Sequence, residues 1–355
     1  MHTVTIEPLG EAVTVADGQT ILEACLRAGI WLPHACGHGL CGTCKIDVLE
    51  GEVDHGAASS FALMDGERLE GKALACSAMP RSSLVIEAEI DEDPDALCLP
   101  VRDHAGAVER LVRLTPDILG IELAVPGAGI AFQAGQYVNV TIPGVEGTRP
   151  FSIASPPSRP NRIELQVRRV PGGRGTGWLH EQLREGDRLA FAGPYGRFFV
   201  RKSAPAPLLF LAGGSGLSSP KSMIVDLLEN GDTRPITLIH GARGQDHFYD
   251  VAQLGALAER HQNFRYVRAL SDRGSDDGWD GAHGFVHEVA ARLYDGRFAG
   301  LRAYLCGPPA MIEACIGVLM KGRLFERDIF TERFSTAADG ASSLAKSPLF
   351  KRLGR

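Results

Sequence analysis

Segments that alternate between apolar and polar positions fill the first 16 residues. Val4-Thr5-Ile6 and Val13-Thr14-Val15 flank a turn at residues 8–10, and this alternation predicts a β-hairpin. The following segment places Ile21, Leu22, Cys25 and Leu26 on one face of a short helix, which opens at residues 17–20 and ends at Gly29. A further apolar run at residues 84–86 predicts another strand of the same small domain.

Short strands separated by frequent Gly and Pro fill the chain from about residue 100 to 202. Three of them are residues 137–142, 163–167 and 188–192. Several strands at such close spacing are typical of a small antiparallel barrel.

From Pro205 onward, apolar strands alternate with amphipathic helical stretches. The strands are expected at residues 208–212, 236–239, 266–270 and 303–306, and the intervening helices include residues 219–229 and 251–260. This order is typical of a parallel α/β sheet covered by helices.

These patterns predict a multidomain protein: an α+β N-terminal domain, an antiparallel β-barrel and an α/β domain with a parallel sheet. The boundaries that we expect are 1–92 for the first domain, 93–100 for a linker, 101–203 for the barrel, 204–335 for the α/β domain and 336–355 for a tail. A length of 355 residues fits this division, because single hydrophobic cores stop growing near 250–300 residues.

Charge is distributed unevenly between these regions. Residues 1–95 carry a net charge of −12, whereas residues 96–355 carry +6. An acidic head of this kind predicts a positively charged docking partner and argues against nucleic acid, although a solvated acidic surface without a partner is the plainer alternative. No apolar run approaches the roughly 18 residues of a membrane span, and no secretory signal is visible at the N-terminus. We therefore expect a cytoplasmic protein that does not bind membranes.

Four cysteines have a distinctive spacing in the acidic head. Cys36, Cys41, Cys44 and Cys76 follow the pattern C-x4-C-x2-C-x31-C, which is the spacing of plant-type 2Fe–2S ferredoxins. Thiolates are soft ligands that suit iron–sulfur clusters, and Gly37, Gly39 and Gly42 allow the loop to approach a cluster closely. The alternative is a structural zinc site with four thiolate ligands, although such ligands are more often arranged as two separated pairs.

A possible flavin site is found in the barrel region. Arg149 can bind a phosphate through its guanidinium, Phe151 offers a ring for stacking and Ser152 offers a hydroxyl. A second segment, Gly172 to Gly177, precedes a helix that we expect at residues 178–183, and a Gly-rich turn at a helix N-terminus is a natural anion site. Alone, the first segment is equally consistent with a surface arginine beside a core phenylalanine.

Two Gly-rich turns follow strands of the α/β region. Gly213 to Pro220 resembles a dinucleotide fingerprint, but Ser219 stands in place of the third glycine and the next strand ends at His240 rather than at an acidic residue. The last strand ends in Cys306-Gly307-Pro308-Pro309. Because ligands bind at the carboxyl ends of such strands, the two turns predict one nucleotide crevice. Cys306 is then either a neighbour of the nicotinamide or a small buried core residue.

Taken together, the motifs resemble a known group over nearly the whole chain. The four-cysteine segment is similar to a plant-type ferredoxin with a β-grasp fold, and the three later motifs are similar to the ferredoxin-NADP reductase superfamily. Further segments resemble the reductase components of bacterial phenol hydroxylases, namely residues 91–95, 132–139, 324–330 and 337–340. The resemblance implies a 2Fe–2S cluster, FAD and NADH as cofactors.

The resemblance also implies roles for individual residues. The metal ligands would be Cys36, Cys41, Cys44 and Cys76, and the catalytic group would comprise Ser152, Cys306 and Phe334. Cofactor-binding residues would be Arg149, Phe151, Ser152, Ile153, Gly175, Thr176, Gly177, Gly214, Ser215, Gly216, Arg243, Cys306, Gly307, Pro308, Glu332 and Phe334.

The implied function is that of an NADH-dependent reductase that passes electrons from NADH through FAD and the cluster to the hydroxylase component of an aromatic monooxygenase. The partner would dock at the acidic ferredoxin domain. Two alternatives remain open from the sequence: a reductase of another oxygenase system, and a zinc- and nucleotide-binding module without enzymatic activity.

Overall fold

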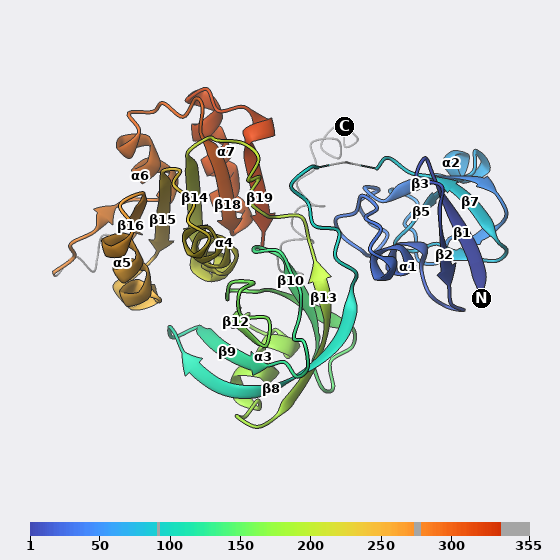
Figure 1. The fold of residues 1–355 in the computed structure, drawn as a ribbon, viewed down its shortest axis with the longest axis horizontal. Coiled ribbons are helices and arrows are strands. Elements are labelled where there is room, and N and C mark those ends of the chain that lie inside the picture. The colour runs from blue at the N-terminus through green and yellow to red at the C-terminus, as the bar shows by residue number, and fades with distance from the viewer. Residues whose placement is uncertain (91–92, 273–277, 335–355) are drawn as a thin grey trace, which may run out of the picture. The chain divides into compact units, whose positions relative to one another are not determined.

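The computed structural model describes residues 1–90, 93–272 and 278–334, and its chain divides into two compact units, Met1–Arg102 and Asp103–Arg355 (Figure 1). The expected tail at 336–355 therefore lies outside the described residues, as do Asp91 and Glu92 at the end of the first expected domain. None of the helices within these ranges is long and apolar enough to cross a bilayer.

The first unit is built on a five-stranded sheet in the order β2-β1-β7-β3-β5. These strands are β1 (His2–Glu7), β2 (Glu11–Val15), β3 (Lys45–Glu50), β5 (Lys72–Leu74) and β7 (Leu84–Glu87). A small pair, β4 (Val53–Asp54) and β6 (Met79–Pro80), and a short helix, α2 (Asp65–Leu69), complete the unit. The expected hairpin is confirmed, since β1 and β2 pair antiparallel from His2 opposite Val15 to Ile6 opposite Glu11.

The predicted helix of this unit is α1 (Ile21–Ala28). The Thr20 hydroxyl accepts the main-chain N–H of Glu23, and Gly29 ends the helix in the left-handed region with φ 84°. Ile21 and Cys25 are fully buried, so Cys25 is a core residue as expected. The sequence pattern was sufficient here because the cap, the apolar face and the terminating glycine all lie within ten residues.

The barrel consists of six antiparallel strands in the order β11-β10-β13-β8-β9-β12. Their bounds are β8 (Arg102–Arg113), β9 (Ile118–Ala124), β10 (Tyr137–Thr141), β11 (Thr148–Ser152), β12 (Arg162–Arg168) and β13 (Arg188–Tyr195). A β-bridge between Ile153 and Leu165 joins the two edge strands, so the sheet curls round on itself. Apolar side chains such as Val138, Ile163 and Phe191 fill its interior.

The helix of the barrel differs from the prediction. It is α3 (Arg174–Glu181), which begins four residues before the expected start at Trp178. Gly175, Thr176 and Gly177 thus belong to its first turns rather than to a preceding loop. Glycine is a poor helix former, but here the Thr176 hydroxyl accepts the main-chain N–H of Val170 at 3.0 Å and fixes the first turn.

A six-stranded parallel sheet forms the rest of the second unit, in the order β17-β16-β15-β14-β18-β19. The strands are β14 (Leu208–Gly213), β15 (Ile236–Ala242), β16 (Phe264–Leu270), β17 (Ala282–His283), β18 (Arg302–Gly307) and β19 (Ile329–Arg333). The helices are α4 (Ser218–Glu229), α5 (Val251–Arg260), α6 (Val286–Leu293) and α7 (Pro309–Lys321), with short 3-10 turns at Gly214–Leu217, Gln245–His247 and Glu326–Asp328. The predicted α/β alternation is confirmed by this order.

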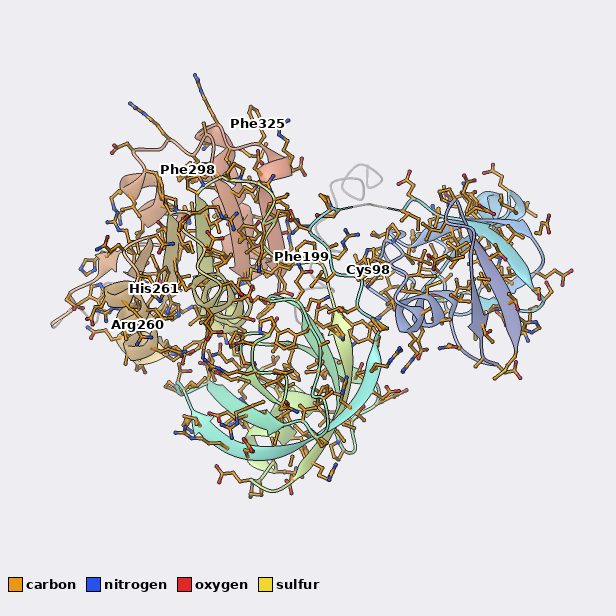
Figure 2. The ribbon with its side chains drawn as sticks, viewed as in Figure 1. Cys98, Phe199, Arg260, His261, Phe298 and Phe325 are labelled. Atoms are coloured by element: carbon orange, nitrogen blue, oxygen red, sulfur yellow. The ribbon has the colours of Figure 1, made fainter. Side chains whose placement is uncertain are left out.

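Two separate apolar cores hold the helices on opposite faces of the parallel sheet. Met223 of α4 and Leu254 of α5 pack with Phe210 and Tyr304 on one face. Side chains of α6 and α7 pack with Leu211 and Phe298 on the other, and Figure 2 labels Phe298 among them. Cys315 of α7 is fully buried in this second core, as its apolar helical surroundings predicted.

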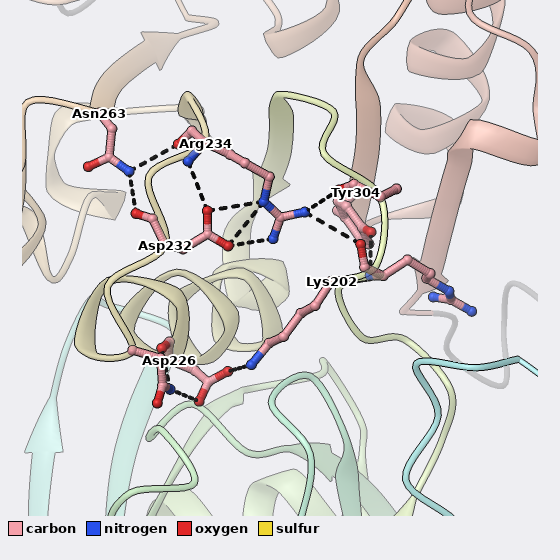
Figure 3. A network of polar contacts seen from close by, with 9 residues as sticks. Lys202, Asp226, Asp232, Arg234, Asn263 and Tyr304 are labelled. Atoms are coloured by element: carbon pink, nitrogen blue, oxygen red, sulfur yellow. Dashed lines mark hydrogen bonds and ion pairs between the residues drawn. The ribbon is translucent and has the colours of Figure 1, made fainter.

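The segment between the barrel and the sheet is tied to the sheet by polar contacts (Figure 3). Arg234 is held by Asp232 and donates to the carbonyl of Ala204 at 2.8 Å. Lys202 pairs with Asp226 of α4 at 2.8 Å, and the Tyr304 hydroxyl accepts the main-chain N–H of Arg201. These contacts help to explain why barrel and sheet form one compact unit.

Candidate functional site

The four spaced cysteines come together in the first unit because two strands bring distant parts of the chain alongside each other. Lys45 of β3 pairs with Leu74 of β5, and the main-chain N–H of Ala75 donates to the carbonyl of Cys44. Cys44 therefore lies near Cys76 and their thiols interact, as do those of Cys36 and Cys41. The result is two pairs of thiols in one place.

This pairing suits a cluster of two irons, each of which needs two thiolates. Among the described residues, no three His, Cys, Asp or Glu side chains are grouped as ligands of a single metal ion. Main-chain N–H groups also point at the sulfurs: those of His38 and Leu40 lie 3.4 Å from Sγ of Cys36, and that of Gly39 lies 3.3 Å from Sγ of Cys76. Such donors stabilise the negative charge of a bound cluster.

Gly39 is required at its position in the cysteine loop. It has φ 73°, and a Cβ there would lie 2.6 Å from the hydroxyl oxygen of Ser77 and 3.0 Å from the carbonyl oxygen of Ala57. The glycine thus allows the loop to fold over Cys76.

The surroundings of Cys41 and Cys76 favour the thiolate that a metal needs, whereas the hydrogen bond with Cys76 and burial raise the pKa of Cys44. Hydrogen bonds from Cys44, Ser77 and the N–H of Gly39 lower the pKa of Cys76 to about 6, against the effect of burial. Burial raises the pKa of Cys41, but hydrogen bonds with Thr43 and Cys36 outweigh it and leave that pKa at about 7. At neutral pH part of the ligand set is therefore ready to bind a metal.

In the second unit, Arg149 lies beside the N-terminus of α3. A Cβ on Gly175 would lie 3.3 Å from Cγ of Arg149 and 3.0 Å from Cδ1 of Ile142, so the helix packs directly against the arginine. The Arg149 guanidinium donates to the carbonyls of Glu146 and Thr148, and no carboxylate pairs with it in the described part of the chain. Together with the uncapped first turn of α3, it forms a cationic cradle that fits a phosphate.

The other residues of the expected flavin segment follow along β11. Phe151 is half-buried against the barrel core, whereas Ser152 and Ile153 are buried. Because the Ile153 side chain is fully enclosed in that core, only its main chain can face a ligand. Ser152 pairs with Tyr137 of β10, so the tyrosine lies next to it on the sheet.

The Gly-rich turn after β14 is packed against the end of β18. A Cβ on Gly216 would lie 2.3 Å from the carbonyl oxygen of Cys306, and one on Gly213 would lie 2.5 Å from Sδ of Met311. Gly214 has φ 58°, and its carbonyl accepts the hydroxyl of Tyr249 at 2.9 Å. The two turns that the sequence analysis assigned to one crevice are thus in direct contact.

Four side chains meet at the boundary between barrel and sheet. One carboxylate oxygen of Glu332 in β19 accepts the hydroxyl of Ser152 at 3.2 Å, the hydroxyl of Ser219 at 2.5 Å and the thiol of Cys306 at 3.4 Å. Ser152 comes from the barrel, whereas Cys306, Ser219 and Glu332 come from three elements of the sheet domain. The arrangement brings the expected flavin segment and the expected nicotinamide segment to one point.

Burial is the main influence on the pKa values of Glu332 and Cys306. It raises the pKa of Glu332, although the hydrogen bonds from Ser219, Cys306 and Ser152 partly oppose the change. It also raises the pKa of Cys306 well above that of a free thiol, and the neighbouring Glu332 adds to the effect. Cys306 is therefore a neutral hydrogen-bond donor and not a reactive thiolate.

The remaining expected residues lie around this group or at the crevice edge. The N–H of Phe334 donates to the carbonyl of Gly307, and its ring packs against the sheet core. Pro308 precedes the first turn of α7. Ser215 lies in the Gly-rich turn after β14 and Thr176 in the first turn of α3, whereas Arg243 is exposed beyond the end of β15.

Ser219 is the residue of this group that the sequence analysis did not select. It was noted only as the residue that replaces the third glycine of the fingerprint. The serine hydroxyl itself could have indicated a role for Ser219, because a buried polar side chain in a packed turn needs a hydrogen-bond partner.

Three family models match the chain in the order of these sites. The 2Fe–2S iron–sulfur cluster binding domain matches residues 4–81, the oxidoreductase FAD-binding domain matches residues 107–200 and the oxidoreductase NAD-binding domain matches residues 210–316. The cofactors are therefore a 2Fe–2S cluster, FAD and a nicotinamide nucleotide, and the zinc alternative is not supported.

Known proteins that are similar to this chain over its whole length show which family it belongs to. The chain is 58% identical to the reductase component of phenol 2-monooxygenase from Pseudomonas sp. strain CF600, with 99% of each chain covered. It is 53% identical to the phenol hydroxylase P5 protein of Acinetobacter pittii, again over 99% of each. The crystal structure of the Amycolatopsis reductase GcoB aligns with a TM-score of 0.85 and 35% identity, covering 95% of this chain and 100% of that one. The chain belongs to the family of phenol hydroxylase reductase components, in which an iron–sulfur domain precedes an FAD- and NAD-binding oxidoreductase.

Proposed function

We propose that this reductase delivers electrons from NADH to the hydroxylase component of a phenol-type monooxygenase, and that the hydroxylase docks on the acidic iron–sulfur domain. The observation that carries the proposal is the contact of Ser152 and Cys306 with one carboxylate, Glu332. It joins the flavin segment to the nicotinamide segment within one compact unit. The bound groups supply the redox chemistry, since FAD takes up an electron pair from NADH and the cluster passes electrons on singly.

In the barrel, side chains and main-chain groups would bind FAD, orient its ring and shield it from water. The cradle of Arg149 and the first turn of α3, with Gly175, Thr176 and Gly177, would bind the FAD phosphates. Phe151 would stack on the flavin, Ile153 would offer its main chain, and Ser152 would hydrogen bond to the flavin ring. Such groups are useful because they fix the ring before the substrate arrives.

On the nucleotide side, the two Gly-rich turns would hold NADH. Gly214, Ser215 and Gly216 would line its pyrophosphate, and Arg243 would reach its outer part. Cys306 with Gly307 and Pro308 would lie beside the nicotinamide. Glu332 and Phe334 would close the far side and keep water out.

The acidic charge of the first unit supports the docking proposal. Cys41 is exposed, so one edge of the cysteine loop is accessible to a partner. Acidic side chains dominate residues 1–95, which carry a net charge of −12. We propose the reducing cytoplasm as the compartment, where thiolates stay available as cluster ligands and disulfides are rare.

The first prediction concerns the function itself. The purified holoprotein should contain iron, sulfide and FAD in the ratio 2:2:1 that one 2Fe–2S cluster and one flavin require, and NADH should bleach both absorptions. Adding purified phenol hydroxylase should then support phenol oxidation. A toluene monooxygenase hydroxylase or a Rieske dioxygenase, supplied in parallel, should be reduced more slowly. Equal or faster delivery to one of these would overturn the assignment to a phenol-type partner.

The second prediction concerns docking. Raising the salt concentration from about 0.05 to 0.5 M should slow electron delivery to the hydroxylase by roughly tenfold or more, because attraction between opposite charges is screened. The reduction of the flavin by NADH, measured in the same buffers, is the internal control and should change much less. Delivery that is independent of salt would contradict docking at the acidic surface.

A further inference from the structure

A buried polar cluster joins the barrel to the α/β domain outside the group around Glu332. Its centre is Lys221 of α4, which is only 4% exposed. The Lys221 ammonium lies 2.8 Å from a carboxylate oxygen of Glu164 in β12 and 2.8 Å from Oδ2 of Asp250, the residue before α5. The lysine therefore links the barrel to two elements of the sheet domain.

Neutral side chains complete the cluster. The Gln166 amide donates to both carboxylates, at 2.8 Å each, and its oxygen accepts the Ser218 hydroxyl at 3.1 Å. Charges of Glu164 and Asp250 raise the pKa of Lys221 in spite of burial, so the ammonium stays protonated. Each charged group thus has a partner within the cluster, in which one ammonium is shared by two carboxylates.

The cluster contacts the turn Gly214–Leu217, called the nucleotide turn below, from two sides. Asp250 adopts the left-handed conformation with φ 54°, and its neighbour Tyr249 donates to the carbonyl of Gly214 at 2.9 Å. On the other side, the Ser218 hydroxyl lies 2.8 Å from the carbonyl oxygen of Ser215. A displacement of Lys221 from Glu164 would consequently move the turn relative to the barrel.

Energetics indicate that stability alone does not explain this arrangement. Buried ion pairs gain little over well-packed apolar residues, because removing the charges from water is costly. What such a cluster does provide is a fixed geometry, since each polar group has one set of partners. The cluster lies between strand β12 of the barrel and the turn Gly214–Leu217, so its fixed geometry can set the distance between the two.

We propose that Lys221 is a positioning residue for hydride transfer, which sets the nucleotide turn at Gly214 against the barrel through Glu164 and Asp250. The inference rests on the proposed function, since it concerns the step in which NADH reduces the flavin. Lys221 itself would touch neither nucleotide nor flavin, because its ammonium is enclosed by Glu164 and Asp250. Its effect comes from distance, because a misplacement of about 1 Å can cost on the order of 100-fold in rate.

The third prediction tests this role with K221M, which keeps the length of the side chain but removes its charge. Flavin reduction at saturating NADH, followed by stopped-flow absorbance, should slow by about 10- to 100-fold. FAD content and reduction by dithionite should remain as in the unaltered protein. NADH deuterated at the transferred position should be oxidised still more slowly, because the hydride step limits the rate.

A matched control is available at the same boundary. Arg159 of the barrel pairs with Glu229 of α4 at 3.0 Å, but this pair is exposed and lies at the opposite end of the helix. R159M should leave flavin reduction within about twofold of the unaltered rate. E164Q, a milder change in the buried cluster, should slow the reduction in the same way as K221M and decides the question if K221M does not fold.

The outcomes separate the two proposals. Rates for both E164Q and K221M that match R159M, or a slowed reduction without an isotope effect, would overturn the positioning role. Loss of FAD from the variants as the cause of slow turnover would also overturn it. Failure of NADH to reduce the unaltered holoprotein would instead overturn the proposed function, and the inference with it.

Discussion

Replacement of Cys76 by serine, C76S, is expected to remove the cluster and stop electron delivery while the flavin is still reduced by NADH. Cys76 accepts the N–H of Gly39 and lies near Cys44, so its loss leaves one thiol pair incomplete. A serine oxygen is a harder and less acidic ligand than a thiolate, which suits iron–sulfur clusters poorly. The rate of electron delivery to the hydroxylase should fall by on the order of 100-fold or more, a larger loss than mutations of residues that only hydrogen bond to metal ligands cause.

The measurements are iron and sulfide content, the visible spectrum, and NADH oxidation with dichlorophenolindophenol as a two-electron acceptor. C98S serves as the control, because Cys98 is an exposed cysteine of the same unit outside the C-x4-C-x2-C-x31-C pattern, and its main chain packs against Gly29. It should retain the cluster and full delivery. If C76S lost flavin reduction together with the cluster, the division of labour between the two units would be wrong.

Elements whose signals are local were predictable from the sequence. The hairpin of β1 and β2, helix α1 between Thr20 and Gly29, and the apolar strands of the parallel sheet are all confirmed. In each case the alternation, the caps and the terminating glycine lie within one short stretch. The cysteine spacing was similarly informative, because three ligands occupy one loop of nine residues.

The start of helix α3 was harder to predict, because a glycine can mark a turn or can allow close packing within a helix. The run from Gly172 to Gly177 was interpreted as a turn that ends at Trp178, yet α3 already begins at Arg174. Glycine normally disfavours a helix, but a Cβ on Gly175 would crowd Arg149 and Ile142. Close packing, which single-sequence patterns do not reveal, accounts for the glycine there.

The sequence predicts that the two Gly-rich turns share one crevice, but it does not show which side chains of distant segments touch each other there. Glu332 receives hydrogen bonds from Ser152, 180 residues earlier, and from Ser219, 113 residues earlier. Lys221 likewise meets Glu164 and Asp250 only after the barrel has packed on the sheet. Lys221, Glu164 and Asp250 have no feature in their local sequence that distinguishes them from ordinary surface residues. Their grouping is a property of the tertiary structure.

The last prediction concerns Glu332, whose replacement E332Q should slow flavin reduction and remove a decline in protein stability with rising pH. One carboxylate oxygen holds Ser152, Ser219 and Cys306 together. An amide retains a single acceptor oxygen, and its NH2 group needs an acceptor that this cluster of donors does not offer. The side chains around the nicotinamide segment should therefore rearrange, with a loss of about 10- to 100-fold in the rate of flavin reduction by NADH.

The stability effect follows from the raised pKa of Glu332. Between the ordinary carboxyl pKa and that raised value, the unfolded chain has released a proton that the folded chain retains. The free energy of unfolding therefore decreases as pH rises through this window, and it stays lower above it. Glutamine does not titrate, so the stability of E332Q relative to the unaltered protein should increase from pH 4 to pH 8, as measured by urea unfolding at fixed pH values.

S219A provides the matched comparison, because it removes one hydrogen bond to Glu332 and keeps the carboxylate. That hydrogen bond lowers the pKa of Glu332, so its loss should raise the pKa further and steepen the decline in stability with pH. The two variants are thus expected to change the pH dependence in opposite directions. A pH dependence in E332Q that equals that of the unaltered protein would mean that Glu332 is ionised as readily in the folded as in the unfolded chain, and that its three donors, rather than burial, control its charge.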